Sequence, residues 1–144
     1  MENKLPLKIR NYKITPFVAC GDYVTSTVFL IEYKKKKVIY APCDVKPFPR
    51  DRQLRKPDLL ILGEVLPEGP LKEGITVPKD NPLRKELFSI EEVLELAKSL
   101  GAKKTVATHI EEEWDRNYDD YKIIEKKYTK NNIQFAYDGM KIIV

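Results

Sequence analysis

The only histidine of the chain, His109, follows the β-branched run Thr105–Thr108 and precedes a polar turn. Such a run is typical of a β-strand, so we expect the imidazole at a strand end. Asp44 holds an equivalent place after the run 38–41. Carboxylate and imidazole both bind Zn²⁺, and also Mn²⁺ or iron, which predicts a metal site. The simpler alternative is a turn-capping aspartate and an ordinary polar histidine.

Four strands are predicted to precede these ligands or lie between them, over residues 8–17, 25–33, 37–41 and 57–63. The first should end near Pro16, and a lysine-rich hairpin, Lys34 to Lys37, should join the second and third. The apolar run 57–63 is typical of a strand covered on both faces. The proline-rich segment 64–88 is expected to form a long excursion.

The second half alternates helices and strands. Ser89 and Glu92 form a capping box at the start of an apolar-periodic helix that Gly101 ends. A second helix is expected over 117–130, and a closing hairpin over 133–137 and 140–144. The order β-β-β-β-α-β-α-β-β predicts an α/β fold, in which one domain (1–144) holds a mixed β-sheet with helices on one face.

The composition limits the function classes. Apolar residues make up 42% of the chain and charged residues 33%, as in soluble proteins. No apolar stretch is long enough for a membrane span or a signal peptide, so we expect a cytoplasmic protein without a membrane partner. The abundance of lysine, glutamate and isoleucine is thermophile-like. A net charge of +4 is mild, and the lysine run reads as a solvated turn rather than a nucleic-acid surface.

Four segments together resemble a known family. Their order and spacing, closing on a Phe-Ala-Tyr-Asp-Gly-Met sequence, are similar to the C-terminal half of metallo-β-lactamase-fold hydrolases, over about residues 14–144. The branch most similar contains the phosphonate-pathway cyclic phosphodiesterase and the pyrroloquinoline-quinone biosynthesis protein. The resemblance implies half of an αββα sandwich. The segments are 39–44, 59–63, 105–110 and 135–142.

The resemblance also implies roles for individual residues. Asp44 matches the aspartate that bridges two metals, and His109 matches a terminal histidine ligand, so Zn, or Mn or Fe, is the implied cofactor. Another family histidine falls near Cys20, whose thiolate can bind zinc; Asp22 is a weaker replacement, and a lost ligand is the simpler alternative. Two metals activate a water against a phosphodiester or another ester-like bond.

The chain departs from the family in what it lacks. The H-x-H-x-D-H signature supplies most ligands, and a chain with one histidine does not contain it. Where relatives often carry a further histidine, this chain has Leu87 and Phe88. We therefore expect a truncated protein that is inactive alone, or one half of a split metal-dependent phosphodiesterase. The alternative is a non-catalytic interaction or scaffold module that kept the fold and lost the metal chemistry.

A half-sandwich should leave one sheet face without cover. We expect five apolar strand residues to divide between a covered and a bare face: Val28, Leu30, Ile39, Leu60 and Leu62. A large bare apolar face is rare on a stable monomer, so a homodimer or a complementary chain should cover it. A fragment of a longer protein is the third solution, against which Met1 argues mildly.

Two charged segments lie close in sequence to Asp44 and His109, and each has two alternative roles. Arg50, Arg52 and Arg55, with Lys56, follow Asp44 and could hold a substrate phosphate, or be surface charge. The acidic turn 111–113 follows His109 and could orient the imidazole, or be a solvated turn. A third function, nucleic-acid binding through 34–37 and 50–56, would require strong salt dependence.

Overall fold

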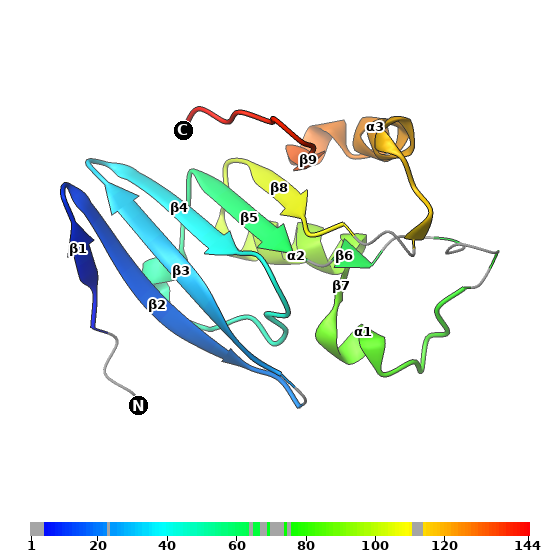
Figure 1. The fold of residues 1–144 in the computed structure, drawn as a ribbon, viewed down its shortest axis with the longest axis horizontal. Coiled ribbons are helices and arrows are strands. Elements are labelled where there is room, and N and C mark those ends of the chain that lie inside the picture. Colours follow the sequence, from blue (N-terminus) through cyan, green and yellow to red (C-terminus); the bar gives the residue numbers. More distant parts are fainter. Residues whose placement is uncertain are drawn as a thin grey trace.

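The chain folds around one large, twisted sheet (Figure 1). The structure, a computed structural model, describes residues 5–22, 24–63, 65–66, 69, 74, 76–110 and 114–144. Seven strands form the sheet in the order β1-β2-β3-β4-β5-β8-β9. Their bounds are β1 Leu7–Ile9, β2 Tyr12–Cys20, β3 Thr25–Tyr33, β4 Lys36–Ala41, β5 Leu59–Gly63, β8 Thr105–Thr108 and β9 Ile133–Phe135.

The sheet is mixed, as predicted. Strands β1 to β4 form an antiparallel meander, whereas β4, β5, β8 and β9 are mutually parallel. Parallel pairing needs crossover connections. The segment 42–58 provides the one between β4 and β5, and the helices provide the others. The helices are α1 Leu83–Glu86, α2 Ile90–Leu100 and α3 Tyr118–Lys127, with short 3-10 turns η1 Arg52–Leu54 and η4 Thr129–Asn131.

The cap signals of the two longer helices are confirmed. Ser89 Oγ accepts from the Glu92 amide while the Glu92 carboxylate accepts from the Ser89 amide, and Gly101 ends α2 in the left-handed region. Asn117 and Asp120 form the same reciprocal pair at the start of α3. In the described residues, no helix is long and apolar enough to cross a membrane.

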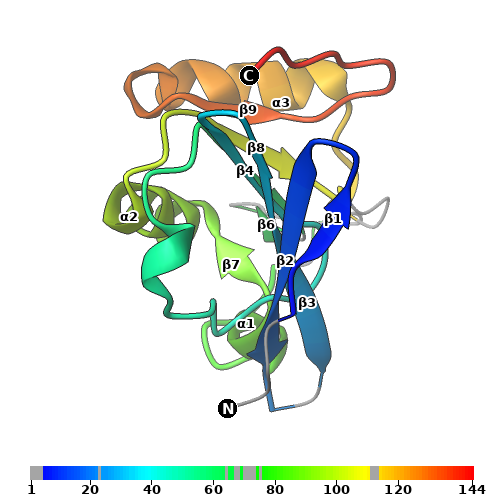
Figure 2. The same cartoon turned by 90° about the vertical axis from the view of Figure 1, so that its left-hand side faces the viewer.

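One face of the sheet carries the core. The register aligns Leu30 with Ile39, Ile39 with Leu60, and Leu60 with Thr105, so these side chains share a face. Helices α1 and α2 lie on one side of the sheet (Figure 2), and α2 packs its apolar stripe into the same core. All five residues expected to divide between two faces lie on the covered one and are buried: Val28, Leu30, Ile39, Leu60 and Leu62.

That expectation was wrong because local sequence does not reveal the register that aligns alternate residues across strands. The opposite face is formed by the intervening residues, and over β2 to β5 it is partly exposed: Val18 is 44% exposed and Tyr40 39%. Phe29, Ile31 and Ile61 on this face are half-buried. Toward β8 the face closes, since Leu59 and Val106 are buried.

Three boundaries differ from prediction. The first predicted strand divides at a turn where Arg10 has a φ of 54°, and β2 runs through Pro16 to Cys20. The closing hairpin does not form: the turn at Asp138 and Gly139 exists, but the described residues after it join no strand. Strand β9 is therefore the edge strand of the sheet and pairs only with β8, in parallel. The excursion adds β6 Val65–Leu66 and β7 Phe88–Ser89, paired with each other.

Candidate functional site

The carboxyl ends of β4, β5 and β8 meet at one edge of the sheet. Ala41 at the end of β4 aligns with Leu62 of β5, and Gly63 aligns with Thr108 at the end of β8. Asp44 and His109 follow β4 and β8 directly, so both are carried to this edge, as the sequence predicted. Ligand sites in α/β sheets commonly lie outside the carboxyl ends of the strands.

A glycine allows the chain to cross at this edge. A Cβ built on Gly63 would lie 1.7 Å from the Pro42 carbonyl oxygen. The loop after β4 therefore folds directly over the end of β5, toward β8. Only a residue without a side chain permits that approach.

His109 crosses the end of β5 to contact the loop after β4. Its Nδ1 lies 3.1 Å from the Pro42 carbonyl oxygen, a contact between residues far apart in sequence. The backbone of His109 adopts a left-handed φ of 54°, which turns the chain sharply after β8. A carbonyl acceptor at Nδ1 fixes the ring orientation and favours the tautomer with its proton on that nitrogen. The imidazole is thus positioned beside the loop that carries Asp44.

Asp44 is half-buried, with few internal partners. In the described part of the chain, its one hydrogen-bond partner is the Cys43 thiol, with 3.8 Å between Sγ and Oδ2. A thiol is a weak donor. The carboxylate therefore keeps acceptor capacity for a cation or a donor from outside.

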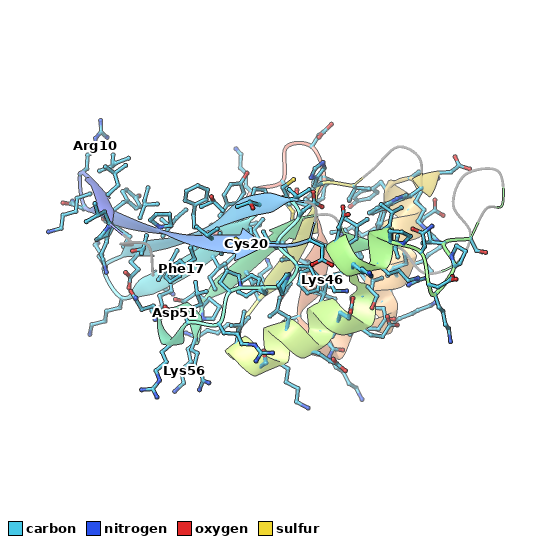
Figure 3. The ribbon with its side chains drawn as sticks, turned by 90° about the horizontal axis from the view of Figure 1, so that it is seen from below. Arg10, Phe17, Cys20, Lys46, Asp51 and Lys56 are labelled. Atoms are coloured by element: carbon cyan, nitrogen blue, oxygen red, sulfur yellow. The ribbon has the colours of Figure 1, made fainter. Side chains whose placement is uncertain are left out.

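Cys20 is the last residue of β2, beside the loop that carries Asp44. A Cβ on Gly21 would lie 2.9 Å from the Lys46 carbonyl oxygen, so the turn after β2 contacts the loop after β4 (Figure 3). Cys20 is an exposed free thiol, with Thr25 Oγ1 4.0 Å from its sulfur, and Asp22 is exposed. Even so, the described residues contain no group of three potential metal ligands close enough to hold an ion.

The arginines that follow Asp44 in sequence do not surround it. The chain carries them back toward the start of β4, where Lys37 Nζ donates to the carbonyl oxygens of Gln53 and Arg55. Figure 3 shows Lys56 well away from Lys46. Parallel pairing of β4 with β5 forces this return, because β5 must start at the edge where β4 starts. Arg50, Arg52, Arg55 and Lys56 are all exposed. The three arginines line one surface pocket with Lys46, and whether they hold a substrate phosphate stays a prediction.

Lys46 anchors the loop that carries Asp44. Its ammonium donates to both Glu92 carboxylate oxygens, at 2.6 and 2.8 Å, and to the Arg84 and Leu87 carbonyl oxygens. The same nitrogen lies 5.5 Å from the ring centre of Phe88. Leu87 and Phe88 are buried here and provide no ligand. The acidic turn 111–113 lies outside the described residues.

Solved structures share this fold. Human tRNase Z, short form (ELAC1), aligns with 96% of this chain at a TM-score of 0.63 and 18% identity. The metallo-β-lactamase fold protein YhfI from Bacillus subtilis aligns with 97% at 0.66 and 17% identity. A diphosphatase of the PhnP family aligns with 99% at 0.64 and 16% identity. The chain therefore has a metallo-β-lactamase fold, as its sequence suggested.

The alignments cover one part of each solved protein. This chain spans 45%, 52% and 47% of the three solved chains, in the same order, which is about half their length. No family model and no curated protein sequence matches the chain. The fold class, half of a metallo-β-lactamase sandwich with a mixed sheet, is confirmed, while the metal-binding roles of Asp44, His109 and Cys20 stay predictions.

Proposed function

We propose that this chain provides one half of a metal-dependent hydrolytic site for a phosphodiester or another ester-like bond. Asp44 would bridge two metals and His109 would bind one of them, with zinc the first choice and manganese or iron the alternatives. The observation that carries the proposal is the His109–Pro42 contact, which holds the imidazole beside the loop bearing Asp44. Without further ligands the half-site is expected to be inactive.

The two side chains fit a metal by their chemistry. Metal-ligating histidines usually give one ring nitrogen to a carbonyl or carboxylate, and the other to the metal. The Nδ1 contact of His109 is of this kind, so Nε2 would be the ligating atom. Asp44 Oδ1 and Oδ2 meet only a weak thiol donor among the described residues, which suits a bridging carboxylate. Cys20 is the candidate third ligand.

The rest of the site must come from a second body of protein. Bound metal would lower the pKa of a water molecule and polarise the ester, which is the chemistry a complete site supplies. This chain would hold and orient the cations through Asp44 and His109. The partly exposed apolar face of β2 to β5 is where a second sheet, from another copy, a complementary chain or the rest of a longer protein, would pack.

Metal content tests the proposal directly. We expect close to one equivalent of zinc per chain in tag-free protein purified without chelator, by elemental analysis, and none above background in the Asp44→Ala/His109→Ala variant. Equal metal in both proteins would overturn the assignment of ligands. We also expect no chelator-sensitive hydrolysis of bis-p-nitrophenyl phosphate by the isolated chain. Such activity would overturn the half-site.

A second candidate function is a scaffold that has lost the metal chemistry. The observation in its favour is that the described residues contain no cluster of three ligands. A scaffold predicts no metal in the wild type. It also predicts unchanged self-association, measured by sedimentation, after the double substitution of Asp44 and His109.

A further inference from the structure

A small pocket lies between α3 and the segment after β9. Its volume is about 300 Å³. Ile110, the residue after His109, forms part of its wall, and so does Ala136, whose amide donates to the Ala107 carbonyl oxygen of β8. The pocket therefore lies near the carboxyl end of β8. The side chains that matter to its chemistry are Arg116, Tyr118, Tyr121, Lys122, Phe135 and Tyr137.

The aromatic walls of the pocket are held in place. Tyr118 and Tyr137 meet edge to face, with ring centres 5.4 Å apart and planes at 84°. Lys122 Nζ lies 5.1 Å from the centre of the first ring and 5.5 Å from that of the second. The same ammonium donates to Glu125 at 2.7 Å, and Glu125 also accepts from the Phe135 amide at 2.7 Å. This network fixes two half-exposed rings without burying them.

Beneath them lies a polar group without a partner. Tyr121 is only 5% exposed and packs its ring against Phe135, with centres 4.7 Å apart. Within the described structure its hydroxyl makes no hydrogen bond. Buried tyrosine hydroxyls usually have a partner, so this one is an unmet hydrogen-bonding group within the pocket wall, with its oxygen buried.

The charges on the walls balance. Arg116 and Lys122 are offset by Glu125 and Asp138, so the pocket has no strong attraction for a polyanion. Lys122 lies over both rings, and Tyr118 and Tyr137 still keep about half of their surface exposed. Exposed ring surface, a neutral lining and hydrogen-bonding groups suit a flat, polar, aromatic ligand. Stacking of a base on an aromatic side chain contributes about 1–3 kcal/mol.

We propose that this pocket binds a planar heteroaromatic ring of the nucleobase class, carried by the substrate whose ester bond lies at the Asp44–His109 edge. The position of the ester rests on the proposed function, whereas binding of the ring does not require metal. The ring would stack on Tyr118 or Tyr137 and extend its substituent past Ile110 toward His109.

Adenosine binding to the metal-free chain tests this inference. We expect saturable binding at millimolar concentrations by saturation-transfer NMR, unaffected by competing inorganic phosphate. Tyr137→Leu should weaken it roughly fivefold or more, as the loss of one stacking partner implies. Tyr12→Leu is the matched control, because Tyr12 is also part of an exposed ring pair, stacked 4.7 Å from Tyr33 on the β2–β3 pair.

The inference would be overturned by an absence of saturable binding, or by equal weakening by both tyrosine variants. Full competition by inorganic phosphate would also overturn it, since the ligand would then be the anion alone. AMP and a short oligoadenylate distinguish a free nucleotide from a nucleic-acid end as the source of the ring.

The Asp44→Ala/His109→Ala variant separates this inference from the proposed function. Adenosine binding retained without metal in either protein would sustain the pocket and reject the metal site. Metal binding without adenosine binding would sustain the metal site and reject the pocket.

Discussion

Two aspartates lie at opposite ends of the parallel strands, and their surroundings differ. Asp58 precedes β5 and is 10% exposed; it accepts from the Lys37 amide at 2.9 Å and from Lys103 Nζ at 2.8 Å, with Lys36 Nζ at 3.8 Å. Asp44 follows β4 and meets only the Cys43 thiol among the described residues. One carboxylate is satisfied internally and the other is not.

The difference separates a structural carboxylate from a candidate ligand. Both Asp58 oxygens serve to tie the starts of β4, β5 and β8 together. The hydrogen bond from Lys103, followed by that from the Lys37 amide, holds the pKa of Asp58 below its ordinary value of 3.8. A saturated carboxylate of this kind has no capacity for a metal, whereas Asp44 retains it.

The largest expected loss of stability comes from adding a side chain at Gly63, where the loop after β4 passes over the end of β5. Gly63→Ala places a methyl group against the Pro42 carbonyl, so we expect a loss of more than ~3 kcal/mol in the free energy of unfolding, measured with urea. Gly139→Ala is the control: its φ of 79° is strained for alanine, but the space is open, and it should cost only about 1 kcal/mol. Similar costs would show that the crossing is not constrained.

Paired substitutions test the two aspartates themselves. Asp58→Asn weakens hydrogen bonds to a charged acceptor and should cost about 1–3 kcal/mol of unfolding free energy. Asp44→Asn should change stability by less than about 0.5 kcal/mol, because its carboxylate supports little of the fold. Equal losses would mean that Asp44 is structural too.

Acid tests the role of Asp58. Because the folded pKa of Asp58 is lowered, its stabilisation is present above pH ~4 and is lost as the pH falls through the folded pKa. We expect urea midpoints to fall with acid less steeply in Asp58→Asn than in the wild type. A slope unchanged in Asp58→Asn would contradict the assigned role.

The smallest expected effect on stability at neutral pH is that of Tyr121, in α3. Burial raises its pKa from 10.0 to about 12. The unfolded chain therefore ionises first, and stability should be lost as the pH rises from about 10 to about 12. Tyr121→Phe should remove that alkaline loss, as followed by urea unfolding. An unchanged alkaline slope would show that the hydroxyl ionises freely in the folded chain.

Local sequence determined much of the architecture. The caps at Ser89 and Gly101, the apolar runs of β3, β4, β5 and β8, and the placement of Asp44 and His109 after strands all follow from short-range patterns. These signals act within a turn or a strand, where neighbouring residues decide the backbone conformation.

Only the tertiary structure decided which of those pieces meet. Register placed all five tested apolar residues on one face, and parallel pairing of β4 with β5 returned the segment around Arg52 and Arg55 to the start of β4. The chain end after β9 joins no strand. The His109–Pro42 contact and the pairing of Tyr118 with Tyr137 join residues distant in sequence. Such contacts depend on long-range packing, which the periodicity of a single segment does not encode.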